Sequence, residues 1–308
     1  MNFRMRGFTV AVGVFDGLHI GHRKLLEVGK KLSRELDTTF YVLSFIYPFE
    51  YYFNKEDFPG LLYTPSYRSA QLYNCGASGV FFLDLIELKD LRPDDFILLL
   101  KENGVRGIVV GSDFKFGKNA SGNVELLKKL CDSNNMKAVG VPPVEIDGTK
   151  VSSSWIRSLV MEGNVRKAAK LLGSPYKITG EVVRGRRLGS ELGFPTANID
   201  RGHERLVVPK FGVYLTKVRV KEDEYFGIMN IGLRPTVEET EEVKYEVHII
   251  EFPVLDLYEE KIEVELLEYM RPEFKFESLE ELKKAMEEDL ERAKNLIQNW
   301  RSNPGRNE

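Results

Sequence analysis

The chain has 308 residues, of which 43% are hydrophobic and 30% are charged, so its composition is that of a folded globular protein with room for two domains. Its 44 Lys and Arg residues stand against 47 Asp and Glu residues, and the formal net charge of −3 excludes a general attraction to nucleic acids or anionic membranes. We expect small-molecule partners, no nucleic-acid or membrane partner, and at most weak self-association.

Cysteine use and the start of the chain indicate the compartment. Cys75 and Cys131 form no Cys-x-x-Cys pair, which argues against a disulfide framework or a structural zinc site. The apolar run at residues 8–15 is followed directly by Asp16 and lacks a small-residue cleavage site, so it predicts a buried strand rather than a signal peptide. We expect a cytoplasmic protein.

The first half of the chain alternates short apolar runs with helical patterns, which is typical of a parallel sheet flanked by helices. The expected strands are residues 8–15, 39–45, 79–83, 105–111 and 138–141. The expected helices are residues 21–36, 66–74, 94–102 and 123–133. The pattern predicts a doubly wound, Rossmann-like α/β domain.

A helical stretch at residues 154–172 ends at Gly173-Ser174-Pro175, where glycine can cap a helix and proline cannot continue it. We place the domain boundary there, which gives domains 1–173 and 174–308.

Beyond the boundary, short strands follow one another without helices between them, which predicts a small barrel or sandwich. The expected strands are residues 177–184, 212–220, 225–231, 244–251 and 261–267. A terminal helix is predicted at residues 278–297, opened by a capping box of Ser278 and Glu281.

The segment Gly-Val-Phe-Asp-Gly-Leu-His-Ile-Gly-His, residues 13–22, joins the first strand to the first helix. Backbone N–H groups and the positive end of the helix dipole attract an anion there, and imidazoles can donate hydrogen bonds to phosphoryl oxygens. We predict that His19 and His22 are catalytic. The predicted nucleotide- or phosphate-binding residues of this loop are Gly13, Phe15, Asp16, Gly17 and Gly21. The alternative is that the two histidines only begin a helix.

A second polar segment, Val-Ser-Ser-Ser-Trp-Ile-Arg at residues 151–157, places hydroxyls and an arginine at the start of a helix, where they can hold phosphate. Alone, it would be interpreted as a serine N-cap. Together with residues 13–22 it resembles the His-x-Gly-His superfamily of nucleotidyltransferases, whose motif Ile-Ser-Ser-Thr-x-Ile-Arg embraces the triphosphate. The resemblance implies nucleotide-binding roles for Ser152, Ser153, Ser154 and Arg157.

The segment Gly-Ser-Asp-Phe-Lys-Phe-Gly-Lys-Asn, residues 111–119, fails the P-loop pattern, because five residues separate its glycines and Asn119 follows Lys118. It resembles the Asp-Phe-x-Phe-Gly loop of bacterial FMN adenylyltransferases. The resemblance implies FMN as the acceptor and Asp113, Phe114 and Phe116 as flavin-binding residues.

Three segments of the second half carry polar groups: Leu-Gly-Phe-Pro-Thr-Ala-Asn-Ile at 192–199, a polar turn at 229–236, and Tyr-Glu-Val-His at 245–248. The period of two puts Glu246 and His248 on one face of a strand. A carboxylate inside an apolar strand is a candidate general base; the alternative is an exposed strand residue.

In this order, the three segments resemble the riboflavin kinase module, a six-stranded barrel. The resemblance implies that Thr196 helps to coordinate Mg²⁺, that Asn198 lies near the nucleotide phosphates, and that Glu246 takes the proton from the 5′-hydroxyl of riboflavin. Arg271 falls where the family has an arginine near the flavin.

Residues 10–297 together resemble the bifunctional bacterial riboflavin kinase/FAD synthetase family. The resemblance implies that the C-terminal half makes FMN from riboflavin and ATP, and that the N-terminal half makes FAD and pyrophosphate from FMN and ATP. It implies Mg²⁺ and no permanently bound prosthetic group. Two alternatives stay open: adenylyl or cytidylyl transfer to another acceptor, and a barrel that only binds flavin as a regulatory module.

Four departures from the family pattern bear on activity. Val14 stands where the family usually has Asn, and the turn at residues 45–48 lacks the usual acid and histidine. Ser190 replaces an arginine and Glu259 replaces a glycine. We expect an arginine of residues 186–187 to supply the charge lost at Ser190.

Overall fold

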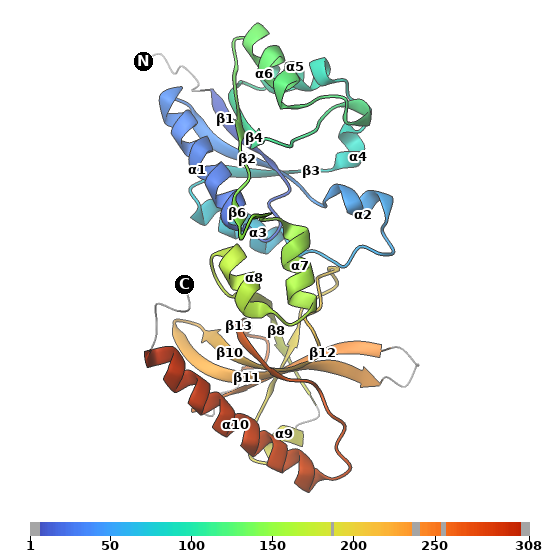
Figure 1. Cartoon of the computed structure of the whole chain (residues 1–308), viewed down its shortest axis with the longest axis vertical. Helices are drawn as coiled ribbons and strands as arrows, with labels where there is room; N and C mark the ends of the chain where they lie inside the picture. The colour runs from blue at the N-terminus through green and yellow to red at the C-terminus, as the bar shows by residue number, and fades with distance from the viewer. Residues whose placement is uncertain (1–6, 186–187, 236–240, 254–256, 303–308) are drawn as a thin grey trace. The chain divides into compact units, whose positions relative to one another are not determined.

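The computed structural model describes residues 7–185, 188–235, 241–253 and 257–302 (Figure 1). The chain divides into two compact units, Met1–Ser153 and Ser154–Glu308. Across the described residues, no helix combines the length and the apolar character needed to cross a membrane.

The N-terminal unit is built on a five-stranded parallel sheet with the order β3-β2-β1-β4-β5. Its strands are β1 (Phe8–Gly13), β2 (Thr39–Phe45), β3 (Gly79–Leu83), β4 (Val105–Gly111) and β5 (Lys137–Val141). Its helices are α1 (Ile20–Glu35), α2 (Phe49–Phe53), α3 (Pro65–Asn74), α4 (Leu85–Leu88), α5 (Pro93–Glu102), the 3-10 turn η1 (Lys118–Ala120) and α6 (Val124–Ser133). A hairpin of β6 (Glu145–Ile146) and β7 (Thr149–Lys150) completes the unit.

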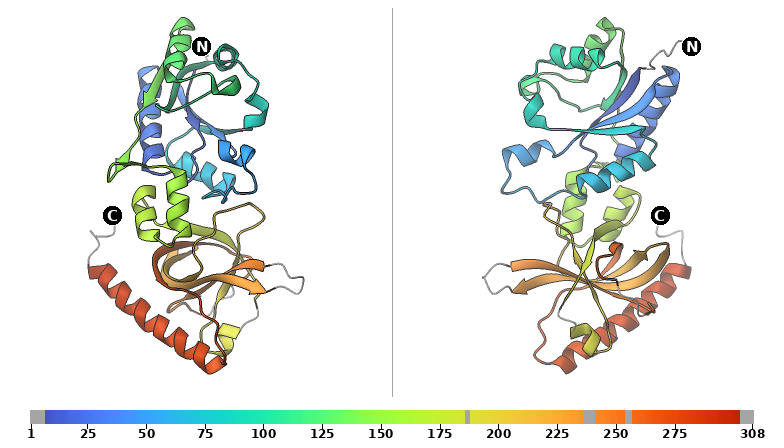
Figure 2. Two further views of the ribbon diagram at one scale, coloured as in Figure 1. Left: turned by 45° about the vertical axis from the view of Figure 1, so that its right-hand side comes forward. Right: turned by 180° about the vertical axis from the view of Figure 1, so that it is seen from behind.

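Helices cover both faces of this sheet, so its central strands are apolar almost throughout (Figure 2). On one face, Ile97 of α5 and Leu127 of α6 belong to a core cluster with Ile108 of β4. On the other face, Leu26 of α1 and Leu72 of α3 belong to a second core cluster. The predicted doubly wound α/β fold is confirmed.

The C-terminal unit contains a closed barrel with the strand order β10-β11-β12-β9-β8-β13. The strands are β8 (Tyr176–Val183), β9 (Ala197–Asp200), β10 (Gly212–Val220), β11 (Asp223–Pro235), β12 (Glu241–Ile249) and β13 (Lys261–Arg271). The helices are α7 (Ser153–Met161), which begins at the division between the units, α8 (Val165–Leu172), α9 (Leu188–Glu191) and α10 (Leu279–Ser302). Ala293 and Ile297 of α10 belong to a core cluster with Val213 and Leu267 of the barrel. The predicted six-stranded barrel with a terminal helix is confirmed.

Three elements differ from the sequence expectation. Strand β11 continues to Pro235, through most of the segment that was predicted as a polar turn at residues 229–236. The predicted single helix at 154–172 is two helices, because Gly163 adopts φ of 79° and Asn164 caps α8. Strand β9, expected as part of a polar turn, pairs with both β8 and β12.

Helices α7 and α8 belong to the barrel unit, and Arg166 of α8 forms an ion pair with Glu268 of β13. The predicted boundary after Gly173 lies later in the chain than the division between the compact units.

Candidate functional site

The predicted phosphate loop, residues 13–22, lies at the carboxyl edge of the parallel sheet because it follows β1. Strand order reverses between β1 and β4, and ligands of open α/β sheets bind outside the carboxyl ends of the strands at such a point. The loop that begins at Gly111 follows β4 at the same edge. The fold therefore brings two of the predicted segments to one side of the sheet.

His19 and His22 form a stacked pair at the start of α1. Their ring centroids are 3.7 Å apart with an interplanar angle of 16°. His19 is the N-cap, and its Nδ1 accepts a hydrogen bond from the backbone N–H of His22 at 3.3 Å. A Cβ at Gly21 would lie 3.1 Å from the His19 ring, so glycine gives the imidazole room above the first turn. His19 does cap the helix, as the alternative interpretation of the sequence expected, but the cap occupies only one of its two ring nitrogens.

Burial keeps both imidazoles uncharged near neutral pH. Desolvation, with a smaller effect of the Lys150 charge, lowers the pKa of His19 from 6.5 to about 4. Desolvation also lowers the pKa of His22 well below its usual value, with added effects of His19 and Arg68. Since Nδ1 of His19 accepts a hydrogen bond, its proton resides on Nε2. His19 is therefore a neutral hydrogen-bond donor rather than a cation.

The stability of the N-terminal unit is expected to fall as the pH drops from 6.5 to about 4. Above pH 6.5 the imidazole of His19 is neutral in both states, whereas between these values the unfolded chain binds a proton that the folded unit excludes. The shift corresponds to roughly 3 kcal/mol. Denaturant unfolding of wild-type protein and His19→Gln at about pH 7.5 and about pH 4.5 measures it, because only the wild type carries this penalty in acid. An equal difference in stability at both pH values would contradict the prediction.

Side chains from three other segments hold the carbonyl groups of the phosphate loop. Arg68 Nη1 and Ser44 Oγ donate to the carbonyl oxygen of Val14 at 2.7 and 2.9 Å. Ser153 Oγ donates to the carbonyl oxygen of Asp16 at 2.8 Å. These bonds occupy two carbonyl oxygens that would repel an approaching phosphate.

Arg68 is a residue that sequence reasoning missed. It is 1% exposed, and its Nη2 donates to the carbonyl oxygen of Ile46 at 2.8 Å, so one guanidinium joins the loops after β1 and β2. One feature of the sequence could have indicated that Arg68 is buried: it precedes Leu72 by four residues, so both lie on the same face of α3, the face that is buried. Its partners lie 22 and 54 residues away in sequence, which periodicity does not reveal.

The buried side chains of Phe15 and Asp16 support the phosphate loop. The carboxylate of Asp16 is fully buried and accepts hydrogen bonds from the backbone N–H groups of Leu62 at 3.0 and 3.1 Å and of Tyr63 at 3.3 Å. Phe15 is also fully buried, with φ of 55°, and a Cβ at Gly13 would lie 3.3 Å from its ring. Gly17 has φ of 80°, a conformation that favours glycine. The nucleotide-binding roles of these residues stay predictions.

The predicted flavin loop is divided between the surface and the core. Asp113 is exposed and forms an ion pair with Lys150, which lowers the pKa of its carboxyl group. Phe116 is 7% exposed and packs with Phe96 in the core, whereas Phe114 is half-buried and stacks on Phe116 at 5.8 Å. Phe114 and Asp113 are thus available to a ligand, and Phe116 supports them.

The predicted triphosphate motif spans the division between the compact units. Ser152 and Ser153 belong to the N-terminal unit, and Ser153 bonds to the phosphate loop. Ser154 and Arg157 belong to helix α7 of the C-terminal unit, where Arg157 is 4% exposed.

Strand β12 of the barrel confirms that Glu246 and His248 share one face. Tyr245, Val247 and Ile249 are buried on the other face. Glu246 is paired in register with Asn198 of β9 and with Asn230 of β11. Its Oε1 lies 2.6 Å from Lys244 Nζ, and 21% of its side chain is exposed. The side chain is partly exposed, as a general base requires, and its register partners on both neighbouring strands carry amide side chains.

The turn that carries Thr196 is held against β12. His248 Nδ1 lies 2.9 Å from the carbonyl oxygen of Pro195, and its ring meets the Phe194 ring edge-on at 5.5 Å. A Cβ at Gly189 would lie 3.4 Å from Thr196 Oγ1, so the chain passes close to the predicted metal ligand. His248 therefore joins Thr196 and Glu246 into one neighbourhood, a role that the sequence pattern did not assign.

Arg271 is engaged elsewhere in the unit. Its Nε and Nη2 donate to the two carboxylate oxygens of Asp289 on α10 at 2.8 and 2.7 Å. This bidentate pair fastens α10 to β13. Its predicted contact with flavin stays a prediction.

Two of the departures from the family pattern, Glu259 and the turn at residues 45–48, can be related to the structure. Glu259 adopts φ of 67°, a conformation that favours glycine. This conformation explains why the family usually has glycine at this position. Tyr47 in the altered turn stacks on Tyr51 at 4.0 Å. The arginines at 186–187 and Thr236 of the second polar turn lie outside the described residues, and the side chain of Ser190 is not described.

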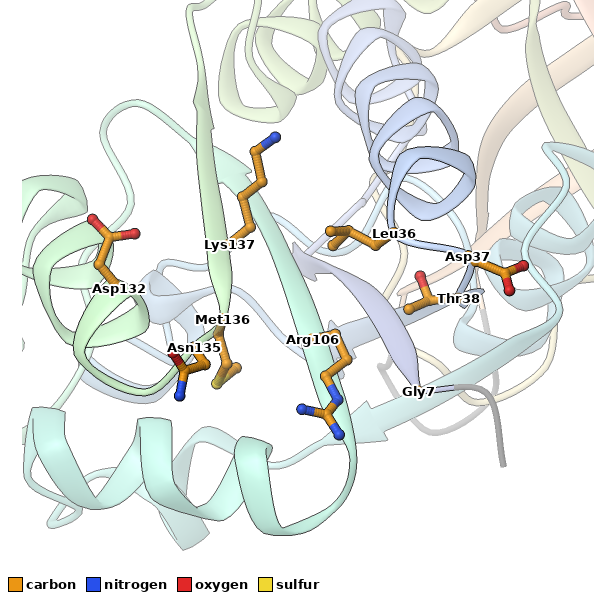
Figure 3. A pocket seen from close by; sticks show the side chains of 9 residues that line it. All are labelled: Gly7, Leu36, Asp37, Thr38, Arg106, Asp132, Asn135, Met136 and Lys137. Carbon is orange, nitrogen blue, oxygen red and sulfur yellow. The ribbon is translucent and has the colours of Figure 1, made fainter. Parts of the chain in front are cut away.

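A cavity of about 600 Å³ lies at the opposite, amino-terminal edge of the sheet (Figure 3). Gly7, Thr38, Arg106 and Lys137 are among its lining residues, and none of the predicted site residues lines it. The chemistry of the phosphate loop is at the other ends of the same strands, so we assign this cavity no part in it.

Known proteins resemble the chain over both units. A family model described as FAD synthetase matches residues 3–155, and one described as riboflavin kinase matches residues 172–297. The bifunctional riboflavin kinase/FMN adenylyltransferase of Buchnera aphidicola subsp. Schizaphis graminum is 34% identical over 300 residues, covering 94% of this chain and 95% of its own. The protein of the same name from Pseudomonas fluorescens is 33% identical, covering 94% and 93%.

A crystal structure described as that of a macrolide-efflux protein from Streptococcus pneumoniae has the same fold, with a TM-score of 0.84, 30% identity and 96% coverage of both chains. From the two family models and the near full-length relatives, the chain belongs to the bifunctional riboflavin kinase/FMN adenylyltransferase family.

Proposed function

We propose that the C-terminal unit transfers the γ-phosphate of ATP to riboflavin, and that the N-terminal unit transfers the adenylyl group of a second ATP to the resulting FMN. The observation that carries the proposal is that one chain combines a neutral histidine pair at a helix start with an accessible carboxylate opposite Asn198 in a barrel. Both reactions belong in the cytoplasm, where ATP is available.

In adenylyl transfer, a phosphate oxygen of FMN attacks the α-phosphorus of ATP, the bond to the bridging oxygen breaks, and pyrophosphate leaves. The N-terminus of α1 and the Nε2–H of His19 stabilise the negative charge that develops on the phosphoryl oxygens. A neutral donor suits this task, because it gives up no proton to the phosphate. His22 stacks on His19 and fixes its orientation.

Asp16 and Arg68 position the loop through the backbone groups that they bind. Ser153 donates to the carbonyl oxygen of Asp16 in the phosphate loop, and Ser152 precedes it in the chain. Ser152, Ser153, Ser154 and Arg157 have the triphosphate-binding roles that the resemblance implies. Asp113 and Phe114 contact the flavin of FMN in this scheme.

In riboflavin phosphorylation, Glu246 accepts the proton of the 5′-hydroxyl as its oxygen attacks the γ-phosphorus and ADP leaves. The hydroxyl of Thr196 and the amide oxygen of Asn198 are hard oxygen donors, which fit Mg²⁺ bound together with nucleotide phosphates. The described residues contain no cluster of three or more His, Cys, Asp or Glu side chains that could hold a metal alone, and such a shared site needs none. Mg²⁺, when bound, offsets charge on the phosphates.

Chromatography of the products formed from riboflavin and Mg-ATP tests both halves. FMN should appear first and FAD should follow, with pyrophosphate released in proportion to FAD. When FMN is supplied directly, FAD should form without the lag. Absence of FAD from FMN, with nucleotide transfer to another acceptor, would favour a different nucleotidyltransferase. Flavin binding without FMN formation would favour a regulatory barrel.

A further inference from the structure

Lys150 stands immediately before the predicted triphosphate motif and is held firmly by its backbone. It ends the β6–β7 hairpin, paired in register with Glu145. The next residue, Val151, is 3% exposed, and its N–H donates to the carbonyl oxygen of Val144 at 2.9 Å. Three residues after Lys150, Ser153 bonds to the phosphate loop. The hairpin therefore delivers a lysine to the edge of the sheet that carries the histidines.

The ammonium group of Lys150 faces a carboxylate at that edge. Its Nζ pairs with Oδ2 of Asp113, in the loop after β4. The positive charge is also close enough to His19 to be the second largest cause of the lowered pKa of that imidazole. Lys150 thus lies within electrostatic reach of both the flavin loop and the adenylyl-transfer centre.

We propose that Lys150 is a further residue of the adenylyl-transfer site, whose ammonium group leaves Asp113 and pairs with the phosphates of ATP. The proposal rests on the function proposed above. The side chains of the pair are 48% and 68% exposed, and ion pairs this open contribute little stability. A triphosphate carries several negative charges, so it competes well with one carboxylate for a lysine on a flexible stem.

The pairing with Asp113 has a role before ATP binds. An unpaired carboxylate beside the phosphate loop would repel ATP, and Lys150 neutralises it. Once the lysine moves to the phosphates, the carboxylate is free to accept hydrogen bonds from the flavin that Asp113 is predicted to contact. Binding of ATP would in this way prepare the site for FMN.

Steady-state kinetics of FAD formation separate this role from a structural one. Lys150→Met should raise the KM for ATP about 10- to 100-fold, the effect of losing one charge-assisted bond, and Lys150→Arg should restore most of it. Asp113→Asn should leave the KM for ATP unchanged or lower it, while the KM for FMN rises. Riboflavin phosphorylation should be unaffected in all three variants.

A matched control is Lys137→Met, which removes an exposed lysine, 3.5 Å from Glu35, at the opposite ends of the strands. It should behave as wild type. Binding of inorganic tripolyphosphate, measured by calorimetry, should weaken in Lys150→Met by the same factor as the KM for ATP. The proposal is overturned if Lys150→Met leaves both values unchanged, or if Asp113→Asn raises the KM for ATP as much as Lys150→Met does. Failure of the proposed function itself is distinct, because the wild-type protein would then make no FAD.

Discussion

Replacing His19 with Asn is expected to slow the conversion of FMN to FAD about 100-fold or more, the cost of removing one preorganised donor to developing charge. Asn is among the best N-cap residues, so the variant keeps the cap of α1 that Nδ1 of His19 provides. What it lacks is the Nε2–H group that faces away from the cap. The measurement is the rate of FAD formation from FMN and Mg-ATP at saturating substrate.

Two further variants identify the cause of that loss. His19→Ala removes both the donor and the cap, so it should lose the same activity and also about 1 kcal/mol of stability. His203→Ala removes an exposed histidine of the C-terminal unit and should leave both reactions unchanged. Riboflavin phosphorylation should stay normal in His19→Asn. Near-normal FAD formation in that variant would reduce His19 to a helix cap.

The sequence predicted best what depends on local periodicity. Alternating buried and polar positions in β12 placed Glu246 and His248 on one face, as the barrel has them. The apolar runs of β1 and β4 predicted a sheet buried on both faces, and His19 was located at the start of a helix. Each of these features is set by residues within a few positions of one another.

Contacts between segments that are distant in the sequence could not be predicted from it. The role of Arg68 could not be predicted, because its partners are backbone carbonyl groups of other loops, and every residue type has such a group. In the sequence, nothing distinguishes Lys150 from other solvent-exposed lysines. In the structure, the β6–β7 hairpin places its ammonium group beside the carboxylate of Asp113. Strand β9 lies inside a segment dominated by turn residues, and only pairing with its two neighbours makes it a strand.

Membership of a motif does not by itself define a chemical role. Asp16 and Phe116 stand in the two predicted binding loops, yet their side chains are directed into backbone N–H groups and the core. Arg271, predicted near flavin, binds Asp289 with both edges of its guanidinium group. The structure thus distinguishes side chains that are directed into the protein from those that are exposed, a distinction that sequence spacing does not contain.

Replacing Glu246 with Gln is expected to lower the rate of FMN formation about 100-fold or more, since a general base contributes about 10² to 10⁴ in rate. Gln keeps the size of the side chain and its place between Asn198 and Asn230, but it cannot accept the hydroxyl proton. The KM for riboflavin should change little, because the loss is confined to the transition state. The conversion of supplied FMN to FAD should continue at the wild-type rate.

A matched control exists on another strand of the barrel. Glu265 is also paired with a lysine, Lys177, at 3.1 Å, and 18% of its side chain is exposed compared with 21% for Glu246. Glu265→Gln removes the same charge from beside a lysine, and Lys177 keeps a second ion pair with Glu263 at 2.6 Å. This variant should phosphorylate riboflavin normally. If both variants lose activity equally, the effect of Glu246→Gln comes from the lost ion pair and barrel stability. If neither loses activity, proton abstraction in this barrel does not depend on Glu246.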